Sequence, residues 1–432
     1  MFHKSKLFSI GFFTLLSINL FSFDLQSRSF SFYKIDSVVF NKESFFYDPE
    51  EALPTGMILG EYLDLSIPLG FSGSFVLRDE LFFEKTPLSG DFSFSEITFN
   101  NYIEELYFNY IFDNGLGLEL GKVNPIYGIA LGYNPTDHFE RLRVAEYKTF
   151  GQKQGPGVWL ARSEILFDWG GLGILYSPEI NFNDFPETIE TIFNTNDNHR
   201  LLVTSTIMSI GDIIPELSFY YDGDYRFGLT GSYQIGNFIF QSESSLNSNS
   251  DNAYFDMTNI RKYPGYIDMS SSVYHENIDG WNLNTIFGVN YISDNLNNFS
   301  IEYAFKGGGY TKSRWDEYLE AVKDGAFGGV QIDGLSGEEA LAKIYYPGQM
   351  AQHYLYLFAS YQDLFINGFK PSCNAEINLV DKSFTYGALL KYEATDNVVI
   401  ESEYRSIYGE DITEFGNALF KDSFYIALKV IF

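Results

Sequence analysis

The stretch of sequence that decides the fold is Arg226-Phe227-Gly228-Leu229-Thr230-Gly231-Ser232-Tyr233-Gln234-Ile235. Large apolar side chains fall on one side of an extended chain here, and polar or small side chains fall on the other. The same split recurs between Trp281 and Tyr291, where aromatic and aliphatic residues oppose three asparagines. A helix would not produce a period of two. The pattern therefore predicts strands with one apolar and one polar face.

Segments of about ten residues with this alternation recur along the chain, which is the length that a tilted strand needs to cross a bilayer. Further candidate strands are residues 57–69, 74–84, 102–112, 116–124, 158–167, 201–210, 238–247, 350–361, 374–380, 384–393, 398–408 and 423–432. Tight turns are expected at Asp113-Asn114-Gly115, Gly236-Asn237 and Thr395-Asp396-Asn397, because Asn and Gly accept positive φ. We predict an all-β, up-and-down antiparallel transmembrane β-barrel of about 16 strands, with roughly 14 or 18 as alternatives.

The composition agrees with a barrel. Aromatic residues make up 18% of the chain, with 43 Phe and 32 Tyr, and the hydrophobic fraction is 45%. Beyond the N-terminal segment, the longest apolar runs are too short for a transmembrane helix. A barrel with aromatic girdles and an apolar lipid face explains this high aromatic content better than a soluble multidomain enzyme does.

The N-terminus has the features of an export signal. Lys4 and Lys6 precede an uncharged apolar run that ends at Phe23. We expect residues 1–23 to be a signal peptide and residues 24–432 to form one barrel domain; a retained helical anchor is the alternative that the short run disfavours. Cys373 is the single cysteine, which excludes an internal disulfide.

The formal charge of −29 excludes nucleic acid as a partner, because such a surface repels a polyanion. Cations and neutral solutes would not be repelled. The acidity has two interpretations of equal weight, solvated acidic loops or an acidic pore.

The C-terminal strand carries a more specific pattern: Phe424, Ile426, Leu428, Val430 and Phe432 share one face. This face resembles the terminal signal by which bacterial outer-membrane barrels are recognised for insertion. The resemblance implies the outer membrane of a Gram-negative-type (diderm) bacterium, contact with its lipid, and the barrel-assembly machinery as a partner. Phe432, Val430 and Leu428 are the candidate assembly signal.

A second resemblance involves Leu118-Glu119-Leu120-Gly121-Lys122, followed after a short gap by Gly132-Tyr133-Asn134-Pro135-Thr136-Asp137. This pair resembles the strand and loop of outer-membrane porin families that carry an Asn-Pro-Thr-Asp turn. The chain departs from that pattern in the gap, where Ile126-Tyr127-Gly128 replaces the usual Trp-Gly. The resemblance covers about 30 residues and favours a porin-type barrel over other barrels.

The alternation also predicts which charged side chains line the lumen. The acidic candidates are Glu105, Glu119, Glu164, Glu243, Glu376, Glu401 and Glu403, and the basic candidates are Arg162, Arg226, Lys391 and Arg405. In a water-filled pore, carboxylates concentrate cations, and facing rows of opposite charge orient solutes. For each residue the alternative is an ordinary solvated or paired wall charge.

Two long connections interrupt the hairpins. Residues 128–155 contain Arg141 and Arg143, which are candidates for a constriction if this loop folds inward; an external loop is the alternative. Residues 307–348 switch to helical spacing, with capping-box pairs that begin at Ser313 and Ser336. Short helices here could form a partial plug, or they could pack on the barrel rim.

The sequence has no clear motif for catalysis or metal binding. The histidines after the signal, His138, His199, His275 and His353, are dispersed without metal-ligand spacing. Asp222-Gly223-Asp224 is more typical of a turn than of a calcium site. We therefore predict no catalytic residue, no cofactor and no metal.

These observations together favour an outer-membrane porin, which is a passive diffusion channel for small hydrophilic solutes with a modest cation preference. The alternatives are a surface adhesin or structural barrel and, with less support, a barrel hydrolase embedded in the membrane. The sequence leaves homo-oligomer formation open.

Overall fold

The structure is a computed structural model of the chain. It describes residues 26–40, 55–69, 72–85, 98–139, 157–180, 196, 198–207, 213–249, 254–256, 261–263, 266–268, 273–275, 279–316, 331–332, 335–336, 348, 350–410, 413–418 and 420–432. The predicted signal peptide lies outside the described residues, and so do Arg141 and Arg143.

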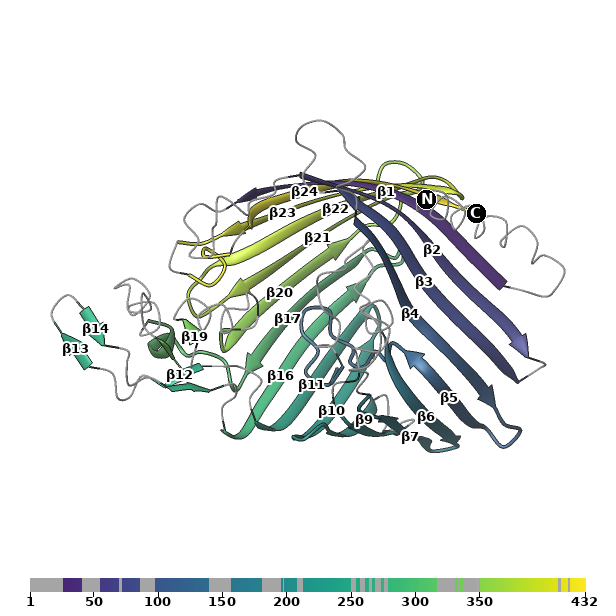
Figure 1. The fold of residues 1–432 in the computed structure, drawn as a ribbon, viewed down its shortest axis with the longest axis horizontal. Coiled ribbons are helices and arrows are strands. Elements are labelled where there is room, and N and C mark those ends of the chain that lie inside the picture. The colour runs from purple at the N-terminus through teal and green to yellow at the C-terminus, as the bar shows by residue number, and fades with distance from the viewer. Residues whose placement is uncertain are drawn as a thin grey trace, which may run out of the picture.

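Eighteen of the described strands form one antiparallel sheet. They are β1 (Gln26–Phe40), β2 (Thr55–Leu69), β3 (Gly73–Lys85), β4 (Thr98–Ile111), β5 (Leu116–Val123), β6 (Val158–Phe167), β7 (Gly170–Ser177), β8 (Arg200–Ile207), β9 (Ile213–Tyr221), β10 (Tyr225–Ile235), β11 (Phe238–Asn249), β16 (Asp279–Ile292), β17 (Asn298–Lys306), β20 (His353–Ser360), β21 (Phe369–Asn378), β22 (Phe384–Thr395), β23 (Val398–Tyr408) and β24 (Phe420–Ile431). Each strand pairs with its neighbours along the chain (Figure 1).

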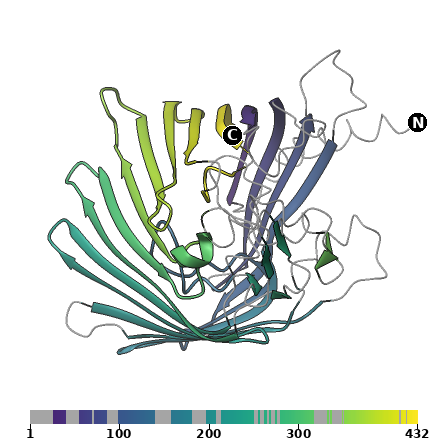
Figure 2. The ribbon, with the colours of Figure 1, turned by 90° about the vertical axis from the view of Figure 1, so that its left-hand side faces the viewer.

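The sheet closes on itself. β1 pairs with β24 from Phe30 opposite Ile431 to Phe40 opposite Phe420. Figure 2 shows the purple first strands beside the yellow last strands at this junction. The up-and-down barrel predicted from the sequence is therefore confirmed, with 18 strands rather than the central value of about 16. The strands absent from the predicted set are β1, β7, β9 and β17.

The connections differ between the two ends of the barrel. The three predicted tight turns are confirmed as the connections β4–β5, β10–β11 and β22–β23. Gly115 and Gly236 adopt positive φ angles of 81° and 58° there. These turns and both ends of the barrel sheet, Gln26 and Ile431, lie at one rim, which we call the short-turn end. Barrels of this kind have short turns on the periplasmic side and longer loops outside.

The two faces of the wall match the predicted alternation. On β10, Phe227 and Leu229 are 47% and 50% exposed, whereas Arg226 and Thr230 are buried. Apolar side chains thus face outward to lipid and polar ones face the lumen. Among the residues that the structure describes, no helix is long and apolar enough to cross a membrane.

The longer connections lie at the other rim, which also has short turns between β9 and β10 and between β21 and β22. A connection that the sequence did not single out follows β11, where β12 (Tyr254–Asp256) pairs with β15 (Val273–His275) and β13 (Arg261–Tyr263) pairs with β14 (Tyr266–Asp268). The β17–β20 connection contains a helical turn at residues 312–316 and the short strands β18 (Gln331–Ile332) and β19 (Leu335–Ser336). Trp315 of this turn is buried, and its ring lies 5.9 Å from that of Tyr310.

Candidate functional site

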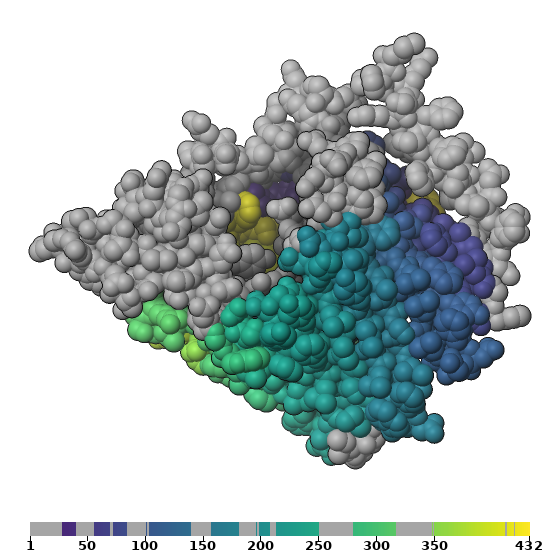
Figure 3. Space-filling view, turned by 60° about the horizontal axis from the view of Figure 1, so that its bottom comes forward, coloured from purple at the N-terminus to yellow at the C-terminus, as the bar shows by residue number. Residues whose placement is uncertain are grey.

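The segment after β5, residues 124–139, folds into the lumen, and we call it the inward segment. It contacts side chains of β10, β11 and β17, which are strands on another part of the wall. In the space-filling view, yellow C-terminal residues lie deeper, in a hollow behind the teal strands (Figure 3). Because it is hydrogen-bonded to inner-wall side chains of these strands, the inward segment lies where it can narrow a channel.

Two wall carboxylates hold four consecutive main-chain amides of the inward segment. Glu243 on β11 accepts hydrogen bonds from the amides of Ile129 and Ala130, the latter at 2.7 Å. Glu302 on β17 accepts from the amides of Leu131 at 3.0 Å and Gly132 at 2.8 Å. Such charge-assisted hydrogen bonds are stronger than those between neutral groups. We call this arrangement the carboxylate clamp.

Neighbouring side chains complete the clamp. Gln241 donates to Glu302 at 2.5 Å, and the Thr136 hydroxyl donates to Glu243 at 2.8 Å. Gly128, with a φ of 87°, begins the turn, and a side chain on Gly132 would come within 2.2 Å of the Tyr356 ring. The path of the main chain thus depends on glycine at both positions.

The Asn-Pro-Thr-Asp stretch forms a turn within the inward segment, where the Asp137 amide donates to the Asn134 carbonyl at 3.1 Å. Beyond it, Phe139 is buried against Tyr220 on β9, with 5.7 Å between ring centroids. His138 stacks on the same tyrosine at 4.8 Å. Burial and the nearby positive charge of Arg226 lower the pKa of His138 to about 3, so this imidazole is neutral at physiological pH.

A second segment, residues 413–418 between β23 and β24, is also bound by a buried carboxylate. Glu414 accepts from the amides of Gly348 at 2.8 Å and Met350 at 3.1 Å. It also accepts from the Tyr354 hydroxyl at 2.7 Å and from Asn378 Nδ2 at 2.6 Å. Glu414 thereby ties together the β17–β20 and β23–β24 connections and the inner wall.

Lys306 on β17 lies between the two segments. Its Nζ donates to the Gly348 carbonyl at 2.9 Å. The same ammonium lies 4.3 Å from the ring centroid of Tyr133, in the inward segment, and 4.7 Å from that of Tyr354. Cation–π contacts with two tyrosines stabilise this position.

The predicted lumen bases are each paired with a carboxylate. Arg162 lies 3.7 Å from Glu119 and 3.1 Å from Glu164. The other pairs are Arg226 with Asp222 at 3.2 Å, Lys391 with Glu393 at 3.3 Å, and Arg405 with Glu403 at 3.2 Å. The wall charges therefore partly cancel.

The remaining predicted acids differ in their surroundings. Glu105 is buried and forms an ion pair with Arg78. Glu376 lies against Gly348, where it leaves no room for a side chain. Glu401 faces Lys391 in the strand register and is 8% exposed. Glu243 is fully buried in the clamp, so it holds the inward segment and is not a free carboxylate facing solute.

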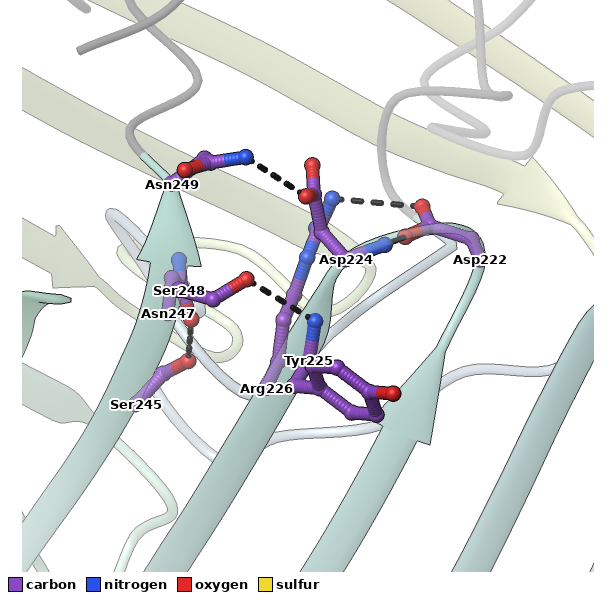
Figure 4. Close-up of polar contacts among 8 residues, drawn as sticks. All are labelled: Asp222, Asp224, Tyr225, Arg226, Ser245, Asn247, Ser248 and Asn249. Carbon is purple, nitrogen blue, oxygen red and sulfur yellow. Dashed lines mark hydrogen bonds and ion pairs between the residues drawn. The ribbon is translucent and has the colours of Figure 1, made fainter. Parts of the chain in front are cut away.

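The Asp222–Asp224 stretch connects β9 and β10 as a turn (Figure 4). Asp222 pairs with Arg226, its Oδ1 accepts from the Asp224 amide at 3.3 Å, and Asp224 accepts from Asn249 at 2.6 Å. These carboxylates are thus occupied by protein donors. In the part of the chain that the structure describes, no group of His, Cys, Asp and Glu side chains is arranged to hold a metal ion.

A cavity of about 1210 Å³ lies at the short-turn end, beside the turns that follow β16, β20 and β22. Lys370, Lys391, Lys429, Glu393 and Glu401 contribute to its lining. Glu393 accepts from Lys370 at 2.8 Å and lies 3.3 Å from Lys391. The inner wall here is polar and hollow.

The sequence did not single out Glu302, Glu414 and Lys306. Glu302 and Lys306 lie on β17, where Phe299, Ile301 and Tyr303 alternate with inward residues, so the alternation could have found them. Glu414 lies in a connection without periodicity, and its contacts are 33 or more residues away in sequence.

No family model and no curated protein sequence matches the chain. Solved structures do match over nearly the whole chain. OccK5 (OpdH) of Pseudomonas aeruginosa is 12% identical with a TM-score of 0.50, covering 94% of this chain and 98% of that one. OccK11 (OpdR) of the same organism is 10% identical with a TM-score of 0.51, at 94% and 96% coverage. OccAB3 of Acinetobacter baumannii is 10% identical with a TM-score of 0.51, at 95% and 99% coverage.

The chain has the fold of a porin-type outer-membrane β-barrel. At this level of identity the likeness concerns the fold alone. The closed sheet and its apolar exterior agree with an outer-membrane location.

Proposed function

We propose that this protein is a porin, a passive diffusion channel for small hydrophilic solutes. The carboxylate clamp is the observation that carries the proposal, because it holds a loop inside a closed, polar-walled barrel. A loop fixed in this way would narrow the lumen and set a size limit. The polar cavity at the short-turn end supports an aqueous path beyond it.

Single-channel recording in a planar bilayer tests the channel, and swelling of proteoliposomes in neutral sugars of increasing size tests the size limit. We expect discrete conductance steps and entry of small sugars only. Purified, folded protein that gives neither signal would reject the porin proposal.

We further propose a modest preference for cations. The chain has a charge of −29, and the predicted lumen acids outnumber the predicted lumen bases, which are themselves paired with carboxylates. Wall charges are screened over about 8 Å at physiological ionic strength, so the preference should increase in dilute salt.

The reversal potential across a potassium chloride gradient measures this preference. Charge reversal at Glu401 and Glu403 should weaken it more than reversal of Glu338, an acid in the connection 307–348. An anion-selective sign would reject the acidic-wall explanation and indicate Arg141 and Arg143 as the filter.

A further inference from the structure

Two turns at the short-turn end present large apolar side chains to water. Leu296, in the turn between β16 and β17, is 67% exposed, and Phe365, in the connection between β20 and β21, is 90% exposed. Ile366 beside it is 54% exposed. Among the described residues, no large apolar side chain is more exposed than Phe365. We call Leu296, Phe365 and Ile366 the apolar tip.

The apolar tip lies beyond the part of the wall that contacts lipid. Phe299, an outward residue of β17, packs against Tyr361 with 5.4 Å between the ring centroids, as expected for an aromatic girdle at the membrane surface. Leu296 and Phe365 lie further towards the ends of the turns. Both also contribute to the lining of the cavity at this end. The apolar tip therefore lies at the mouth of the barrel.

The backbone of the apolar tip is unusual for such side chains. Leu296 and Phe365 have positive φ angles of 61° and 66°. In the β4–β5 and β10–β11 turns the residues with positive φ are Gly115 and Gly236, and glycine adopts this conformation without steric cost. Bulky residues rarely adopt it, and such conformations cluster at sites of binding or switching. The two side chains therefore have a role that the turns themselves do not require.

Hydrogen bonds fix the two turns relative to each other. The Gln362 amide donates to Asn297 Oδ1 at 3.0 Å, which joins the β20–β21 connection to the β16–β17 turn. The Gly368 amide donates to Asp363 Oδ1 at 2.7 Å and closes the β20–β21 connection. The apolar tip is thus preorganised, so little conformational entropy would be lost when a partner covers it.

The surroundings of the apolar tip are acidic. The described turns at the short-turn end contain no Lys or Arg, but they contain Asp113, Asp168, Asp294, Asp363 and Asp396. Of the charged residues that line the cavity, five are acidic and three are lysines. Two of the lysines, Lys370 and Lys391, are paired with Glu393. The apolar tip is therefore surrounded by negative charge, which attracts cations.

We propose that the apolar tip and the aspartates around it form a docking surface for a basic polypeptide segment in the periplasm. An apolar residue of the segment packs on Leu296 and Phe365, and Lys or Arg residues beside it pair with the aspartates. A small cation would leave the apolar side chains in water, and a polyanion would be repelled. A polypeptide supplies both groups, and exposed aromatic anchors typically dominate the binding energy of an interface.

Binding of defined peptides to the full chain in phosphatidylcholine nanodiscs tests this proposal. The probes are three short fluorescein-labelled peptides in which Lys alternates with Phe, Lys alternates with Ser, or Glu alternates with Phe. We expect fluorescence anisotropy, corrected for empty nanodiscs, to show the tightest binding for the peptide of Lys and Phe. Added salt should weaken this binding. Equally tight binding of either of the other two peptides would overturn the proposal.

The double variant Leu296→Gly and Phe365→Gly removes both apolar side chains and places glycine where φ is positive. The fold should therefore be retained, as circular dichroism and heat resistance in detergent would show. The affinity for the peptide of Lys and Phe should fall by at least about tenfold, as for the loss of an interface anchor. The control is Phe112→Ser with Trp169→Ser, which changes exposed residues of short turns away from the cavity and should bind like the wild type.

The charge is tested separately. Asp294→Asn with Asp396→Asn should lower the affinity several-fold and reduce its dependence on salt, whereas Asp113→Asn with Asp168→Asn should change it less. The assay measures binding and not conductance, so its outcome is independent of the channel proposal. Wild-type affinity in the glycine variant, which is the result expected if Leu296 and Phe365 anchor the barrel in lipid, would overturn the proposal. An equal loss of affinity in the control variants would overturn it as well.

Discussion

At the scale of single residues, the buried carboxylates of this barrel accept hydrogen bonds from main-chain amides. Glu243, Glu302 and Glu414 each accept amide hydrogens from segments far away in sequence. A hydrogen bond to a charged group contributes about 1.5–3 kcal/mol, so Glu243 and Glu302 can offset part of the entropy lost when a loop is ordered.

The hydrogen bonds that Glu414 accepts from the amides of Gly348 and Met350 depend on pH. Burial raises its pKa from 4.5 to about 7, and the hydrogen bond from Tyr354 acts in the opposite direction. A raised pKa favours the protonated form in the fold, so this stability is complete below about pH 4.5 and is lost as pH rises towards 7.

Hydrogen exchange at the amides of Gly348 and Met350 measures this pH dependence. After correction for intrinsic rates, protection should be higher at pH 5 than at pH 8. The Glu414→Gln variant should show nearly the same protection at both pH values. An equal pH response in the variant would show that another group is responsible.

The partners of the predicted lumen residues could not be predicted from the sequence. Glu243 falls on the polar face of an alternating strand, so its orientation follows from the period alone. The Ile129 amide, which donates to Glu243, is 114 residues away in sequence and belongs to a segment without periodicity. No local pattern encodes that contact, which is why a carboxylate expected to face solute instead holds a loop.

At the scale of elements, the inward segment is the part of the barrel most directly tied to a channel. Its only strong sequence signals are the glycines and the Asn-Pro-Thr-Asp turn, and its position depends on the clamp. Releasing the clamp should let the segment move within the lumen.

We expect the Glu243→Gln and Glu302→Gln double variant to raise single-channel conductance and to add fluctuations between levels. The amides keep an acceptor but lose the charge, which weakens the clamp by on the order of 3 kcal/mol. Glu403→Gln is the control, because it removes a lumenal charge whose ion-pair partner is Arg405 on the same strand and not the inward segment. The same conductance change in the control would assign the effect to charge and not to the clamp.

Three of the four strands that the sequence missed have physical explanations, whereas β17 alternates clearly and could have been found. β7 has glycine at three of its eight positions, which leaves few side chains to alternate. β9 contains Pro215, which usually disfavours a strand. β1 has serine at outward positions, so the contrast between its two faces is weak.

At the scale of the whole molecule, the closed sheet gives every barrel strand two partners, and unfolding must break the ring. We expect folded protein to resist heat in detergent and to keep its β-type circular dichroism well above the temperatures at which small soluble domains melt. A helical spectrum with early melting would contradict the barrel.

Phe432 offers a test of assembly at this scale. It is 72% exposed, and its amide donates to the Ser29 carbonyl at 2.9 Å, so it contributes little to the lumen. Deleting Phe432 should lower the amount inserted into the membrane while leaving the conductance of inserted barrels unchanged. Normal insertion of the shortened chain would argue against its role as an assembly signal.

The pairing of β1 with β24 also determines when the barrel can close during synthesis. The partner of Phe30 is Ile431, so almost the whole chain is translated between the two. At ~5–20 residues per second, β1 waits on the order of half a minute for its last neighbour to exist. Throughout that interval the edge of β1 is an open template for wrong pairing. The ring can therefore close only after the last strand has been made, so an unpaired β1 has to avoid other strand edges until then.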